Sequence, residues 1–434
     1  MEIFIIIVFG ALVILLTSGL WIVVAAALVG VGVFWYSTGF EAMLMAVKWQ
    51  FWYAVANSTF SAIPLFIFMG FVLLESGLAA RIYGGLEPLL GRLPGGLLHT
   101  NIVVGALFAS ASGSSIAAAT TIGAISLPEM EKRGYPFGVS VGSVGAGGIL
   151  APLIPPSVMM ILYCMVVEES IGKQFMAGIV PGIMLAGMFM AYIALRFSVF
   201  AGKARTKTEQ ISLWEAILKT REIWLIVILI VMVLGSIYGG LATAGEAAAM
   251  GSVGAVVLAL VHRRLNWAVM KKVSINTVRT VVAIHIIYVG IKIMSGGLSV
   301  SGVVGYVTEM LVSLPVPPLV ILTMIFALFL MLGTVMEGIP MMLMMTPIVF
   351  PTVQALGYDA LWFGIIIVLL CNTGNLTPPV GVTLFCLQAL RPERPVTDIY
   401  KGVAPFMIVI LVALALVTAF PQIALWLPGT MVGK

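Results

Sequence analysis

The stretch GGILAPLIPPS at residues 147–157 decides the fold, together with NTGNLTPPVG at residues 372–381. Each places a Pro-Pro pair inside a long apolar segment, and proline removes a backbone donor and breaks a helix. The pairs belong to a longer pattern that occurs twice, 223 residues apart. Its identities are Pro128, Gly134, Tyr135, Pro155 and Pro156, which recur as Pro351, Gly357, Tyr358, Pro378 and Pro379. Two halves that each hold a broken helix are typical of the central site of a secondary transporter.

The composition of the chain is that of a membrane protein. Of its 434 residues, 61% are hydrophobic and only 9% are charged, which is too few charges to cover a soluble domain. Apolar runs long enough to cross a bilayer recur from one end to the other, so we expect an all-α polytopic membrane protein. The net charge of +5 comes from basic residues scattered through short loops, which excludes a nucleic-acid partner.

Two further features favour membrane structure over a metal site or a secretory leader. Cys164, Cys371 and Cys386 lie in apolar segments without metal-ligand spacing, and we interpret them as small core residues. Glu2 stands where a secretory signal would carry a basic residue. We therefore expect the first segment to remain in the protein as membrane structure.

The charges of the loops predict how the chain crosses the membrane. Short loops rich in Lys and Arg stay in the cytoplasm. Such loops occur at 81–92, 129–133, 203–221, 262–272 and 391–394, whereas 36–41, 168–173, 236–240, 313–318 and 351–359 carry few basic residues. The N-terminus is then expected in the periplasm. Because the basic loop at 129–133 matches the loop at 351–359, which has no basic residue, the two halves are expected to be inverted.

These patterns predict two inverted-topology repeats joined by a cytoplasmic linker. The first repeat covers residues 1–200, with a re-entrant hairpin at about 101–127 and a broken helix at about 136–167. The linker covers 201–222. The second repeat covers 223–434, with a hairpin at about 319–350 and a broken helix at about 359–390. Each repeat is expected to open with two short apolar helices, then an interfacial segment and a longer crossing.

The broken helices suggest binding chemistry. Prolines free the carbonyls of the preceding turn, which can ligate a cation, and the half-helix after a break offers amides to an anion. The hydroxyls of Ser110, Ser112, Ser114, Ser115, Thr373 and Thr377 add oxygen ligands. A Pro-Pro pair can also be a mere kink, and a Gly/Ser run can be a helix-packing surface. The symmetric placement of these features favours a site.

Four ionisable residues lie in or beside apolar segments, and their roles stay open. They are Glu246, His285, Lys292 and Glu337. Such residues are functional hypotheses by default. Contact with the substrate, an ion pair between Lys292 and Glu246, and contact with a partner subunit all fit the sequence.

Three segments resemble the large membrane subunit, the DctM-like M subunit, of tripartite ATP-independent periplasmic (TRAP) transporters. They are FASASGSSIAAATTIGAISLPEMEKRGYP at 108–136, IPPS at 154–157 and LTPPVG at 376–381. The resemblance implies an elevator-type carrier in the bacterial or archaeal inner membrane, coupled to at least two sodium ions. It also implies two partners, a small four-helix membrane subunit and a periplasmic substrate-binding protein. Since nothing precedes the first repeat, we expect the small subunit to be a separate chain.

The resemblance also carries sodium ligands onto this sequence. The first set is Ser110, Ser112, Ala151, Ile154 and Pro156, and the second is Gly333, Gly374, Thr377 and Val380. Ala151 departs from the family, which usually has glycine there. For the substrate we expect contacts from polar residues near the hairpin tips or breaks: Ser114, Ser115, Asn375 and Thr383.

The sequence thus predicts sodium-coupled import of a small organic anion delivered by a binding protein. Carboxylates, sugar acids and sulfonates all fit. A sodium/dicarboxylate-type symporter of similar inverted-repeat architecture, working without a binding protein, is the alternative. A channel would show continuous polar rings. An enzyme would need paired acids or a nucleophile with its base, and three scattered histidines without HExxH or GxSxG do not supply them.

Overall fold

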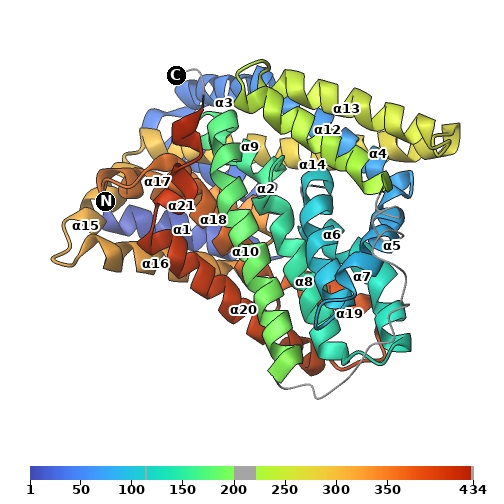
Figure 1. The fold of residues 1–434 in the computed structure, drawn as a ribbon. Helices are drawn as coiled ribbons and strands as arrows, with labels where there is room; N and C mark the ends of the chain where they lie inside the picture. The colour runs from blue at the N-terminus through green and yellow to red at the C-terminus, as the bar shows by residue number, and fades with distance from the viewer. Residues whose placement is uncertain (113–114, 200–220, 432–434) are drawn as a thin grey trace.

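The computed structural model describes residues 1–112, 115–199 and 221–431, with side chains for all of these except 78–80, 108–112, 199 and 221–223. Every regular element in this part of the chain is a helix, which confirms the all-helical fold class (Figure 1). Six of the described helices are long and apolar enough to cross a membrane, and a bent pair adds a seventh span if it is counted as one. The chain is therefore a multi-pass membrane protein.

The first half of the chain forms ten α-helices. They are α1 (Glu2–Thr17), α2 (Ile22–Thr38), α3 (Phe40–Val55), α4 (Ala62–Glu75), α5 (Leu78–Leu90), α6 (Leu97–Ser112), α7 (Ser115–Lys132), α8 (Phe137–Leu153), α9 (Val158–Val167) and α10 (Ile171–Val199). The second half forms α12 (Arg221–Tyr238), α13 (Ala244–Val261), α14 (Trp267–Val300), α15 (Val303–Val312), α16 (Pro318–Gly333), α17 (Gly338–Ala355), α18 (Ala360–Asn375), α19 (Val382–Ala389), α20 (Val396–Ala419) and α21 (Gln422–Leu425).

The two halves have matching helices. A shift of 223 residues carries α7 onto the bounds of α17 and places α2, α8 and α9 within two residues of α13, α18 and α19 at either end. The expected hairpin at about 101–127 is longer, because α6 and α7 together run from 97 to 132. Of the expected linker, residues 201–220 lie outside the described residues, and its last two residues already belong to α12. The inversion of one half relative to the other stays a prediction.

One part of the second half differs from the expected order. Residues 267–300 form the single helix α14, where the first half has α3 and α4 separated by a break. At that break the Asn57 side chain accepts the N–H of Thr59 at 2.9 Å and starts a short 3₁₀ turn. A local side-chain acceptor of this kind competes with helix continuation. The second half therefore has no separate interfacial segment.

The core of the molecule is built around the long parts of the two broken helices. Every residue of α18 from Leu361 to Asn375 is buried, and so is every residue of α8 from 139 to 153. Glycines let neighbouring helices approach α8 closely, since a Cβ added at Gly147 would lie 2.5 Å from the Asn101 carbonyl oxygen of α6. Small residues at such crossings are the usual packing device in membranes.

The two halves are tied together at the start of α18. The Tyr163 hydroxyl of α9 donates to the Ala360 carbonyl at 2.6 Å, and the Gln174 side chain of α10 donates to Leu361 at 3.3 Å. The indole N–H of Trp362 donates to the Val417 carbonyl of α20 at 2.8 Å. The bonds of Tyr163 and Gln174 therefore join the two halves, and that of Trp362 fixes α18 against α20 within the second half.

A second group of helices packs around α14, which contacts α2, α3 and α4. Helix α13 lies against α4 and α12, and Figure 1 shows α12 and α13 along the edge of the molecule away from α20. Within this group Glu75 of α4 binds Lys272 of α14 at 2.7 Å and Asn276 at 3.1 Å. The hairpins and broken helices form the other group, and α14 reaches it through α17.

Candidate ion and substrate site

The first break lies between α8 and α9, which meet at a bend of 42°. Ile154 leaves the helix with an extended ψ of 122°, and a cis peptide joins Pro155 to Pro156. Ser157 then caps α9, since its hydroxyl accepts the N–H of Met160 at 3.3 Å. Pro155 has no N–H to donate to the Ala151 carbonyl four residues earlier, so that oxygen is open to another partner.

The second break lies between α18 and α19 and also contains a cis Pro-Pro peptide, at Pro378–Pro379. Here the Thr377 N–H donates to the Gly374 carbonyl at 2.9 Å, and the Thr377 hydroxyl donates to the Thr373 carbonyl at 2.8 Å. At the first break the equivalent amide, that of Ile154, donates to Leu150 at 2.9 Å. The two breaks are therefore related in position but unequal in their hydrogen bonds.

The second hairpin touches the second break through its backbone. The Gly381 N–H donates to the Thr334 carbonyl at 3.0 Å. A Cβ built at Gly374 would lie 2.6 Å from the Cα of Gly333, so the two helices meet where neither has a side chain. The predicted residues Gly333, Gly374 and Thr377 are thus brought together. Val380 lies on the same loop and is 36% exposed.

The first hairpin approaches the first break at Ala151. Ala151 and Ala118 of α7 are both fully buried and form a small apolar cluster of their own. The carbonyl of Ser115 lies beside α8, 2.9 Å from a Cβ built at Gly148. Ser114 lies outside the described residues, and the side chains of Ser110 and Ser112 lie outside the described side chains. Of this set, Ala151, Ile154 and Pro156 form the break itself.

Ion pairs hold the first hairpin at the loop that ends α7. Arg133 pairs with Glu129 and with Glu87 of α5, and Arg394 pairs with Glu131 at 2.9 Å. Burial opposes the charge of Arg133, but the bonds to Glu129 and Glu87 outweigh it and raise the pKa of the guanidinium. The base of this hairpin is therefore anchored by ion pairs between the last turn of α7, helix α5 and the loop that holds Arg394.

Three of the four expected substrate contacts are described, and two carry open polar atoms. The Asn375 side-chain oxygen and the Thr383 hydroxyl are both buried and have no hydrogen-bond partner among the described residues. Asn375 lies beside the second hairpin, because its Nδ2 is 3.3 Å from a Cβ built at Gly338. Ser115 is buried at the start of α7. A buried polar atom without a partner is where a ligand or water gains most by binding.

The structure shows contacts for three of the four ionisable residues, Glu246, Lys292 and His285. Glu246 forms a capping box with Thr243 at the start of α13, and Lys292 lies over the rings of Tyr53 and Tyr288 at 5.4 and 5.6 Å. The ion pair between Lys292 and Glu246 is not formed. The ring of His285 packs against that of Phe60 in a tilted arrangement, with ring centroids 4.0 Å apart and an interplanar angle of 46°.

Glu337 precedes α17 at the tip of the second hairpin. Together with Arg279 of α14 it lines a cavity of about 330 Å³. The sequence pattern did not single out Arg279, because it lies only a few residues beyond the basic loop at 262–272. Thr334 was also missed, since its contribution is a backbone carbonyl.

The sequence matches the model of a known protein family over nearly its whole length. The model of the tripartite ATP-independent periplasmic transporter, DctM component, matches residues 9–423. The chain belongs to the DctM family of TRAP transporters. A C4-dicarboxylate TRAP transporter large permease of Pseudomonas aeruginosa is 32% identical over 372 residues, which cover 86% of each chain. A sialic acid TRAP transporter large permease of Vibrio cholerae is 29% identical over 380 residues, covering 87% of this chain and 88% of that one.

The fold also resembles that of a solved transporter. The YdaH transporter of Alcanivorax borkumensis superposes with a TM-score of 0.63 over 91% of this chain and 90% of that one, at 14% sequence identity. At that identity the likeness concerns the fold alone. Membership of the DctM family identifies the chain as a transporter permease. The two relatives are named for different substrates, sialic acid and C4-dicarboxylates.

Proposed function

We propose that this chain is the transporting subunit of a sodium-coupled importer of a small organic anion. The observation that carries the proposal is the junction of the second hairpin with the second break, where Gly333 meets Gly374 and Gly381 donates to Thr334. Backbone carbonyls and hydroxyls gather there, and such oxygens are the ligands that hard cations take. The matching first junction would use the Ala151 carbonyl and Ile154, with Ser110, Ser112 and Pro156.

Sodium binding would be coupled to anion binding because the two kinds of site lie next to each other. A sodium ion at either junction would fix a hairpin tip against its broken helix, and Asn375 lies next to the second tip. Thr383, Ser115 and Ser114 would complete the contacts to the anion. If more sodium charge than anion charge is carried, as with two sodium ions and a monoanion, positive charge moves inward, and the membrane potential contributes about 2.3 kcal/mol per net charge per 100 mV.

The movement that we propose is that of an elevator. The group around α14 would be the scaffold, and the hairpins with the broken helices would form the mobile body. Non-helical backbone at membrane depth is tolerated where it lines protein or a water-filled cavity. The first break, with Pro155 and Pro156 buried, would face protein, and the second, with Pro379 and Val380 exposed, would face a water-filled cavity. The chain would lie in the bacterial or archaeal inner membrane with its N-terminus in the periplasm.

Membership of the DctM family favours a tripartite system over the binding-protein-independent symporter. The partners would be a small four-helix membrane subunit and a periplasmic binding protein, and the anion would be set largely by the latter. To test this, the binding protein encoded beside this chain is screened for ligands by thermal shift. Uptake of the ligand is then measured in proteoliposomes with and without the binding protein. Uptake that needs both sodium and the binding protein is expected, whereas equal uptake without the binding protein would establish the alternative.

A further inference from the structure

A cavity of about 330 Å³ lies where the second hairpin faces the scaffold group, and it carries two opposite charges. Its walls come from α14, α4, the start of α9 and the tip of the second hairpin. On α14 the lining residues are Arg279, Thr280, Ala283, Ile284 and Ile287, whose spacing puts them on one face of the helix. The volume is at the low end of the 300–1,000 Å³ found for small-ligand sites.

Both charges are available to a ligand. Arg279 is exposed and Glu337 half-buried, and neither forms an ion pair or a side-chain hydrogen bond within residues 1–112, 115–199 and 221–431. A guanidinium cannot deprotonate in a protein and binds carboxylates through two parallel bonds. A carboxylate is acceptor-only when ionised and needs a donor when it leaves water. Charged residues at such a place are functional by default.

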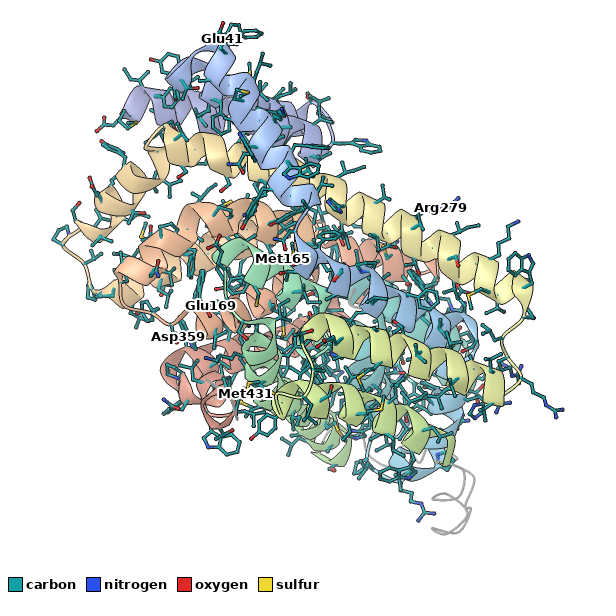
Figure 2. The ribbon with its side chains drawn as sticks, turned by 90° about the horizontal axis from the view of Figure 1, so that it is seen from above. Glu41, Met165, Glu169, Arg279, Asp359 and Met431 are labelled. Carbon is teal, nitrogen blue, oxygen red and sulfur yellow. The ribbon has the colours of Figure 1, made fainter. Side chains whose placement is uncertain are left out.

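The cavity also adjoins the elements that we assign to transport. Glu337 and Ile339 border it at the tip of the hairpin whose Gly338 packs on Asn375, and Val158 borders it directly after the first break. Figure 2 shows Arg279 on α14, well separated from Glu169 and Asp359 at the far ends of the broken helices. The cavity thus lies between the mobile body and the scaffold, beside the proposed sites.

We propose that this cavity extends the proposed substrate site at Asn375 on the side of the scaffold, and that the transported substrate is a monoanion carrying a hydroxyl or ammonium group. Arg279 pairs with its acid group, and Glu337 accepts the hydroxyl or ammonium proton. A second carboxylate would face Glu337 and be repelled, so the cavity selects against dicarboxylates. This inference rests on the proposed function, because it names the substrate class of the same transporter.

The test uses a cysteine reporter in the full-length chain within its complex, in detergent micelles where both faces are accessible. Thr280→Cys places the reporter in the cavity, and Cys386→Ala removes the cysteine that is not fully buried. The rates of labelling by an anionic and a cationic methanethiosulfonate, the sulfonatoethyl and trimethylammonioethyl reagents, are compared. Arg279→Gln should lower the anion-to-cation rate ratio about five- to tenfold, for a charge about 7 Å away at an effective dielectric constant of about 80, because the charge acts on the two reagents with opposite sign.

Glu337→Gln should raise the same ratio, and Lys271→Gln, an exposed lysine of α14 outside the cavity, should leave it within about twofold. A ratio that Arg279→Gln leaves unchanged overturns the proposal.

The ligand class is tested by protection with gluconate and glucarate, which differ only by a second carboxylate. Gluconate should slow labelling more than glucarate, and equal protection, stronger protection by glucarate, or none overturns the assignment. Labelling needs no transport, so a failure of sodium-driven uptake is distinguishable from a failure of this site.

Discussion

Gly374 offers the sharpest perturbation of the second junction, because a single methyl group must push two backbones apart. A Cβ at this position would lie 2.6 Å from the Cα of Gly333, 3.0 Å from its carbonyl carbon and 3.4 Å from its oxygen. Carbon atoms in contact are normally about 3.5–4.0 Å apart, so Gly374→Ala requires a displacement of about 1 Å. All three atoms belong to the backbone of Gly333, so no flexible side chain can turn away to make room.

The displacement acts on the proposed sodium ligands directly. It separates the Gly333 and Gly374 carbonyls and strains the bond from Gly381 to Thr334, which is 3.0 Å long. Overpacking of this kind typically costs about 1–3 kcal/mol. We expect the sodium concentration for half-maximal uptake to rise at least about tenfold, since 1.4 kcal/mol at a binding site is a factor of ten.

The assay is sodium-dependent uptake in proteoliposomes, together with thermal unfolding of the purified complex. Gly187→Ala of α10 is the matched control, because a methyl group there meets nothing within 4 Å. Ala151→Gly is a second comparison, since the first junction already accommodates a Cβ against Ala118. An unchanged sodium dependence in a well-folded Gly374→Ala complex would refute the assignment of this junction.

Four further substitutions test the other contacts. Thr377→Ala and Ser112→Ala should each raise the half-maximal sodium concentration about three- to tenfold, as expected for one lost oxygen ligand, and sodium titration of uptake that shows no change in both would remove these residues from the sites. Asn375→Ala should weaken the apparent affinity for the anion about two- to tenfold at saturating sodium, and a change confined to the sodium dependence would contradict its role as a substrate contact. Lys292→Met should destabilise the protein by about 1–2 kcal/mol through loss of the cation–π contacts, measured by thermal unfolding against Lys271→Met, while leaving the affinity for the anion unchanged.

The repeated prolines made the broken helices and their hairpins predictable. Pro155 and Pro378 mark both breaks, and a helix cannot pass through a Pro-Pro pair at either place. The first hairpin follows because each apolar stretch beside SGSS is too short to span alone, whereas α17, which follows GTVMEG, is long and apolar enough to cross a membrane by itself. The sequence did not identify Asn57 as the residue that divides α3 from α4, because a side-chain cap depends on local geometry. The matching position in the second half lies inside the continuous helix α14.

The contacts within the site were only partly predictable. The meeting of Gly333 with Gly374 agrees with the ligands that the family resemblance implies. The bond to the Thr334 carbonyl is made by the backbone and leaves no signal in residue type. Arg279 could be identified only from the structure, because it matters through the cavity that it shares with Glu337, a residue 58 positions away in the sequence. Lys292 shows the reverse case. An ion pair with Glu246 was one of three roles that the sequence left open, and the structure instead places the ammonium group over two aromatic rings.

The ratio of sodium to anion flux tests the central proposal most directly. Proteoliposomes that hold the complete complex are supplied with the anion that the binding protein retains, and the initial uptake of labelled sodium and labelled anion is measured in parallel. Two junctions that each bind sodium predict at least two sodium ions per anion, with the ratio reduced by Gly374→Ala and unaffected by Gly187→Ala. A ratio of one or less in the unaltered protein would contradict a pair of sodium sites.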